Sequence, residues 1–195
     1  MKLLSFSLAL LLSVPAFGQQ SVRFRGKVED VSGTFNQFVL DCTDVRLTSA
    51  TVALLPLVGQ QGEIQGTYNG NALNPSVEVT SFTPLAEDFE IGGGGKIGDV
   101  AKFEVRGAPG DSALIFGGPG SGFVPLPVAG AVLVDPFQVE LIGIAPIPAT
   151  GLLQFDSPIP NDPALVGVTY HGQALLTLSG GGFRLTMNDC KTLSN

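Results

Sequence analysis

The chain has few of the residues on which most binding and catalytic sites depend. Among its 195 residues there is no tryptophan, and there are only two tyrosines, one histidine and two cysteines. Transition-metal centres draw on several histidine and cysteine ligands, so neither a metal centre nor another cofactor is predicted. Sugar sites commonly stack a ring on an aromatic side chain, so the same scarcity weighs against a carbohydrate site.

Positive charge is also scarce. Charged residues make up 14% of the chain, and 17 acidic residues outnumber 10 basic ones, which gives a net charge of −7. Phosphate groups bind basic surfaces, so nucleic acid and anionic lipid are not expected partners.

Long apolar runs are absent except at the N-terminus. Lys2 precedes the apolar stretch 3–14, Pro15 breaks it, and Ala16 and Gly18 are small residues before a cut after position 18. This is the layout of a secretory signal, and the apolar run is shorter than the roughly 20 residues that cross a bilayer. No cysteine follows it for lipid attachment. We therefore predict a secreted or periplasmic protein without a membrane span, whose signal peptide of residues 1–18 is removed near Gly18.

Cys42 and Cys190 both survive that cleavage. In an exported protein a single pair of cysteines favours a disulfide over a metal site or a nucleophile. The alternatives are two unpaired thiols or an intermolecular link. Cleavage also removes Lys2, so nine basic residues remain against 17 acidic ones, a net charge of about −8.

Glycine and proline together account for 40 residues, which favours many short strands joined by tight turns. In the block 19–86, strands are predicted at 21–31, 38–47 with a bend at 41–44, 51–55, 63–68 and 76–82, with a hairpin-type turn at 68–71. The first of them alternates apolar and charged residues with a period of two, as half-buried strands do. Five short strands in this length predict a small Greek-key barrel.

The pattern VRFRGKVEDV…FVLDCTDVRL…LVGQQGEIQGTY…SVEVTSF resembles bacterial OB-fold-like domains. The resemblance covers about a third of the chain and includes no diagnostic motif. On an OB-like face, Arg23, Arg25, Tyr68 and Asn71 could line a ligand-binding groove.

The second block, 99–195, follows a predicted glycine-rich linker at 87–98. Strands are predicted at 101–106, 112–116, 131–135, 138–144, 151–155, 168–178 and 183–188, and Asp162 could cap a single helical turn. The fold prediction is therefore all-β, with an OB-like barrel followed by an antiparallel β-sandwich. The stretches SALIFGGPGSG, GAVLVDP and IPNDPALVGVTYHGQALLTLSGGGFRLTMN resemble an uncharacterised exported β-sandwich domain that recurs in planctomycete-type bacteria. That resemblance implies no activity.

Three motifs look like catalytic or phosphate-binding sites. Gly110-Asp111-Ser112 resembles the block that carries the nucleophile in GDSL-type esterases, but the residue three before His171, the only histidine, is Val168 and not aspartate. Without an oriented base the serine stays a weak nucleophile, and a turn is the better interpretation. The run Gly92–Lys96 fails the phosphate-loop template, and Gly117–Gly122 lacks the βαβ setting of a dinucleotide loop.

Calcium needs only oxygen ligands, and three local pairs supply them, namely Asp41 with Asp44, Asn161 with Asp162 and Asn188 with Asp189. None matches a calcium-loop consensus, and caps or turns explain each pair better.

The leading functional hypothesis is thus an exported, non-enzymatic β protein. It would bind an envelope or extracellular protein or polysaccharide, or serve as a structural component. The alternatives are an oligosaccharide-binding module and, more remotely, a secreted GDSL-like hydrolase.

Overall fold

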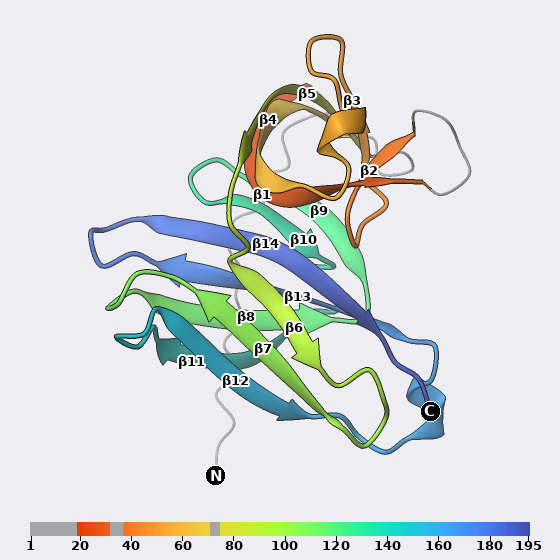
Figure 1. Cartoon of the computed structure of the whole chain (residues 1–195), viewed down its shortest axis with the longest axis vertical. Coiled ribbons are helices and arrows are strands. Elements are labelled where there is room, and N and C mark those ends of the chain that lie inside the picture. Colours follow the sequence, from red (N-terminus) through yellow and green to blue (C-terminus); the bar gives the residue numbers. More distant parts are fainter. Residues whose placement is uncertain (1–18, 32–36, 71–74) are drawn as a thin grey trace.

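The computed structural model describes residues 19–31, 37–70 and 75–195, and strands make up most of them. Figure 1 shows a barrel above a two-layered sandwich of strands. The barrel strands are β1 (Gln20–Asp30), β2 (Phe38–Leu40), β3 (Arg46–Thr48), β4 (Gln61–Asn69) and β5 (Ser76–Pro84). They close in the order β1-β2-β3-β5-β4, with β3 and β5 parallel and the other pairs antiparallel. The predicted OB-like barrel is therefore present.

The alternation in β1 explains why it forms one wall of the barrel. Val22, Phe24 and Val28 are buried and face the barrel core, while Arg23 and Lys27 point outward. A period of two places alternate side chains on opposite faces, so a strand with this sequence can bury one face only.

The predicted strand at 51–55 is wrong. These residues form bends that lead into the short 3-10 helix η1 (Leu55–Leu57), and the predicted bent strand 38–47 supplies both β2 and β3. The Ser49 hydroxyl accepts hydrogen bonds from the backbone of Thr51 and Val52, and such local bonds compete with strand pairing. Leu54, 5% exposed, then inserts into the core at this end of the barrel.

The sandwich has two antiparallel sheets. One contains β12 (Leu152–Pro158), β7 (Val100–Arg106) and β6 (Phe89–Gly93) in that order, and the other contains β11 (Glu140–Pro146), β8 (Ser112–Gly118), β13 (Thr169–Thr177) and β14 (Phe183–Thr192). Their inner faces bury a second core around Phe89, Phe103, Val105, Ile115 and Leu176. The predicted β-sandwich is thus also present.

Strand β6 lies inside the segment predicted to be a linker. Phe89 and Ile91 are almost completely buried in the sandwich core, so this segment contributes packing as well as a connection. The glycine run that follows makes the turn into β7 possible. Gly93 and Gly94 have positive φ, and a Cβ at Gly94 would lie 2.8 Å from the Ala101 backbone.

Strand β9 (Ser121–Leu126) was not predicted either. It pairs with β10 (Gly130–Val134) to form a hairpin. This hairpin lies between the barrel and the sandwich (Figure 1). Ala131 and Leu133 are buried in the barrel core, and the Phe123 ring lies edge-on to Phe24 with centroids 5.1 Å apart. Residues of the second block therefore complete the core of the barrel.

Elsewhere the expected helical turn is confirmed as the 3-10 helix η2 (Pro163–Leu165). Asp162 caps it by accepting a hydrogen bond from the Ala164 amide.

Candidate functional site

The residues predicted to line a groove do not come together. Arg23 and Arg25 lie on the outer face of β1, whereas Tyr68 lies on the inner face of β4. Arg23 is exposed and pairs with Glu63 at 2.8 Å, while the Tyr68 ring packs on Phe123 with centroids 4.6 Å apart. Asn71 lies outside the described residues. The inward position of Tyr68 could have been predicted from the sequence. Tyr68 is four residues from the core residue Ile64, and such residues of a strand share a face.

Arg25 belongs to a buried ion cluster that no sequence motif indicates. Its Nη1 lies 2.6 Å from Oδ2 of Asp88, a residue only 5% exposed, and Arg184 of β14 binds the same oxygen. The other carboxylate oxygen accepts a hydrogen bond from the Met187 amide, and the Asp88 carbonyl accepts one from the Arg106 amide. Asp88 thereby ties the barrel strand β1 to both sheets of the sandwich. Buried carboxylates are stable only when paired in this way.

A second connection is the Cys42–Cys190 disulfide, which is present in the structure with a Cα–Cα distance of 5.7 Å. It joins the turn between β2 and β3 to β14. Cys42 has a φ of 58°, the only positive value among the described non-glycine residues. The Asn188 side-chain amide donates to the Asp41 carbonyl at 3.1 Å, so the turn is held by a hydrogen bond as well as by the covalent link.

His171 lies beside this disulfide, because its partner across β13 and β14 is Cys190. The imidazole is 8% exposed, and burial lowers its pKa from the usual value. A hydrogen bond to the Cys42 backbone and the charge of Asp44 oppose that shift. Its buried Nδ1 has no hydrogen-bond partner among the residues that the structure describes. The lowered pKa favours the neutral form of the ring, which lies beside the β2–β3 turn.

The esterase-like motif runs from the turn before β8 into the first residue of that strand. The Asp111 carboxylate accepts a hydrogen bond from the Ser179 amide at 2.8 Å, which holds the pKa of Asp111 below its usual value. Ser112 pairs with Thr177, whereas His171 pairs with Gly118. Six residues of strand separate the two pairs, which corresponds to roughly 20 Å. His171 therefore cannot act as a base for Ser112.

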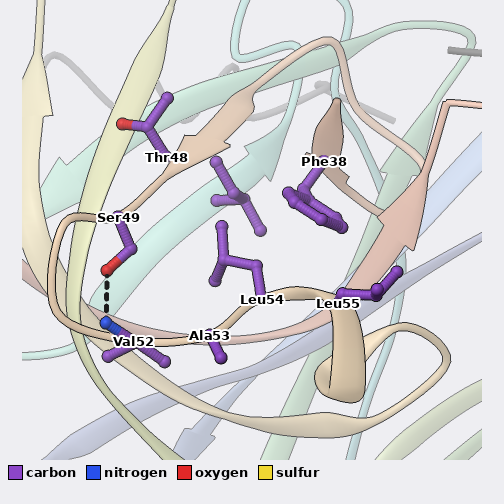
Figure 2. A pocket seen from close by; sticks show the side chains of 8 residues that line it. Phe38, Thr48, Ser49, Val52, Ala53, Leu54 and Leu55 are labelled. Atoms are coloured by element: carbon purple, nitrogen blue, oxygen red, sulfur yellow. Dashed lines mark hydrogen bonds between the residues drawn. The ribbon is translucent and has the colours of Figure 1, made fainter. Parts of the chain in front are cut away.

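A shallow pocket of about 430 Å³ opens at the end of the barrel where Leu54 inserts. Figure 2 shows its walls, which are formed by Phe38, Leu47, Thr48, Ser49, Val52, Ala53, Leu54 and Leu55. The Ser49 hydroxyl donates to the Val79 carbonyl at 2.6 Å and accepts from the Val52 amide, a bond drawn in Figure 2. With that hydroxyl engaged and no charged side chain in its walls, the pocket suits a small apolar group.

Several exposed apolar side chains gather on the outer face of the four-stranded sheet. A row of cross-strand partners runs from Ile144 through Leu114 and Leu175 to Leu185. The β9–β10 hairpin covers the Leu185 end and leaves the other end open. We call the uncovered part the open sheet face. Its apolar residues, all at least partly exposed, are Leu114, Phe116, Leu141, Ile144, Leu175 and Phe183.

Three carboxylates of the predicted oxygen pairs, those of Asp41, Asp162 and Asp189, form hydrogen bonds or ion pairs within the protein. Asp41 binds Lys27 and the Cys42 amide, Asp162 caps η2, and Asp189 accepts hydrogen bonds from the amides of Ile91 and Cys190. Within the described ranges, no three histidine, cysteine, aspartate or glutamate side chains cluster as a metal site would require.

Comparison of the chain with known protein families, with curated protein sequences and with solved structures finds no match. Among the residues that the structure describes, no helix has the length and apolar character needed to cross a membrane.

Proposed function

We propose that the protein is exported and acts outside the cytoplasm as a non-enzymatic binding or structural component. The observation that carries this proposal is the open sheet face. Leu141, Ile144 and Phe183 are each more than half exposed there, in a chain whose other large apolar side chains mostly lie in two cores. Contiguous apolar patches on soluble proteins commonly mark surfaces that bind a partner.

The disulfide supports the exported location. Such bonds persist in oxidising compartments and are rare in the cytosol. Cys42 and Cys190 are 148 residues apart in sequence, and their bond links the barrel to the last strand of the sandwich. This agrees with a signal peptide at residues 1–18, which the sequence predicts.

The two alternative functions have less support. The separation of Ser112 from His171 weighs against the GDSL-like hydrolase, because an isolated hydroxyl is a weak nucleophile. For the oligosaccharide-binding module, the outward position of Arg23 and Arg25 and the inward position of Tyr68 leave the predicted groove without its aromatic platform.

Site-specific photocrosslinking at the surface of the native cell tests the proposal. A photoreactive amino acid would be placed at Leu141 in the open sheet face and, as a control, at Leu55 beside the barrel pocket, because the two side chains are 60% and 63% exposed. We expect protein adducts at position 141 and few at position 55.

Equal labelling at both positions, or no adduct at either, would contradict the proposal. Retention of the purified protein on a polysaccharide column, together with an absence of adducts, would favour the oligosaccharide-binding alternative instead. Turnover of p-nitrophenyl esters that Ser112→Ala abolishes would favour the hydrolase.

A further inference from the structure

We infer that the open sheet face is the contact between two copies of this chain, which pack face to face as a symmetric dimer. This inference rests on the proposed function and names the partner that the face accepts. Its first support is the register of the sheet, which brings apolar side chains from all four strands into one row.

The hairpin shows how this surface is buried within one molecule. At its covered end, Leu185 is 3% exposed and its amide donates to the Ala129 carbonyl in the turn of the hairpin. Gln173 in the neighbouring row is completely buried. Its side-chain oxygen accepts a hydrogen bond from the Leu133 amide, and its side-chain nitrogen donates to the carbonyls of Ala131 and Thr186. The hairpin therefore covers the part of the face that carries Gln173 and supplies two of its three hydrogen-bond partners. The half left open carries apolar side chains, which a second apolar surface can cover without hydrogen bonds.

The lack of charged side chains on the open sheet face permits a second copy as its occupant. The chain has a net charge of −7, so two copies repel each other over most of their surface. The outward positions of the open half hold apolar side chains with Ser112, Pro146 and Thr177 at the border, and none of these residues is charged. Two copies can therefore meet here without placing like charges opposite each other, and charged residues are typically depleted at the centre of such interfaces.

The area also fits a dimer. Full burial of a large apolar side chain removes roughly 60–120 Å² of apolar surface from water, so the six residues of the open sheet face, which are already partly buried, supply at most about 360–720 Å². A standard interface buries about 800 Å² on each partner, of which a little over half is apolar. The open sheet face thus meets the apolar requirement of one small interface.

The geometry of β11 favours face-to-face packing over pairing of edges. This edge strand has an irregularity between Leu141 and Gly143, where its register to β8 shifts. Bulges of this kind interrupt the regular row of donors and acceptors that an added strand needs. Two apolar sheet faces can instead pack at about 10 Å, as the layers of a sandwich do.

Sedimentation velocity of the purified protein, from about 1 µM to about 1 mM, tests the dimer, because interfaces of this size associate with widely differing affinities. We expect a concentration-dependent dimer. Ile144→Glu should raise its dissociation constant by about tenfold or more, because a carboxylate would be buried in an apolar interface. Leu55→Glu is the matched control, since Leu55 and Ile144 are both 63% exposed, and it should leave the dimer unchanged.

A second variant, Phe183→Glu on β14, keeps the test independent of the edge strand. Thermal melting of each variant, with a Tm close to that of the parent, shows that the fold is retained. A protein that is monomeric over the whole range, or a dimer that resists both Ile144→Glu and Phe183→Glu, would overturn the inference. If the monomer nevertheless gives adducts to another protein from Leu141 on cells, the proposed function stands and that protein replaces the second copy as the occupant.

Discussion

The barrel and the sandwich complete their cores in different ways. The barrel is closed at one end by its own segment around Leu54 and at the other by the β9–β10 hairpin, which comes from the second half of the chain. The sandwich fills its interior with its own strands and leaves half of one outer face uncovered. The barrel thus depends on the sandwich for stability, and the sandwich carries the surface that is free to bind. Among the described residues, the disulfide, the Asp88 cluster and the hairpin hold the two together, and the hydrogen bond from Asn188 to Asp41 lies beside the disulfide.

Of these connections, the disulfide should contribute most to the free energy of unfolding. Replacing Cys42 and Cys190 together by alanine removes the link between the barrel and β14. Closing so long a loop is worth about 4–5 kcal/mol in the chain-entropy treatment, less any strain in the native state. We expect the free energy of unfolding in urea to fall by about that amount. A double variant as stable as the parent would show that the other two connections suffice. Mass spectrometry that finds both thiols free in the parent protein would contradict the bridge itself.

The Asp88 cluster should rank second. Asp88→Ala leaves two guanidinium groups, from Arg25 and Arg184, without their shared partner in a largely buried position. Breaking buried ion pairs in this way costs about 3–5 kcal/mol, which chemical denaturation can measure. Glu63→Gln is the control, because it breaks the pair with the exposed Arg23 and should change stability far less. Similar losses in the two variants would mean that the cluster contributes no more than a surface pair.

The hairpin tests whether the two regions unfold as one unit. Leu133 belongs to the second block but is completely buried in the core that also holds Phe24 and Ile64. Leu133→Ala should cost about 2–5 kcal/mol and should destabilise both regions together in a single transition. Phe137→Ala, at a side chain 90% exposed in the turn before β11, is the neutral control. Two separate transitions by calorimetry, with only the barrel shifted, would show that the regions are independent.

The smallest effect on stability should be the pH dependence that arises from the titration of His171. Burial lowers the pKa of His171 in the folded protein, so the unfolded chain takes up a proton first as the pH falls. Stability should therefore decrease as the pH drops below the ordinary histidine value of about 6.5, and His171→Gln should remove part of that decrease. Because this is the only histidine, its imidazole gives one NMR signal that reports the pKa directly. A pKa at or above the ordinary value would contradict the buried, neutral ring.

Much of the fold could be predicted because it depends on local patterns. The alternation of Val22, Phe24 and Val28 identified β1, and Asp162 identified the capped turn of η2. The errors arose where two local signals competed. The glycines at 92–95 suggested a linker and concealed β6, although Phe89 and Ile91 are core residues. Pro125 within β9 and Pro127 in the turn that follows similarly hid this strand, and a strand of a two-stranded hairpin tolerates one proline.

The candidate sites were harder to predict. The OB-like pattern predicts Tyr68 at a groove, yet its spacing from Ile64 places it inside the barrel. The ion cluster at Asp88 could not be predicted, because its partners Arg25 and Arg184 are 63 and 96 residues away in sequence. The open sheet face was also beyond prediction, since whether Ile144 is covered depends on where a distant hairpin packs.

By itself, the sequence determined the strands that alternate, the turns that glycine and proline impose, the acidic balance and the chemistry that favours a disulfide. All of these follow from neighbouring residues or from composition. Only the tertiary structure decided that residues of the second block complete the barrel, that Asp88 joins both regions, and that half of the face carrying Leu114 and Leu175 stays open. These depend on which distant strands meet, and a strand's own pattern states which face it buries but not what will cover that face.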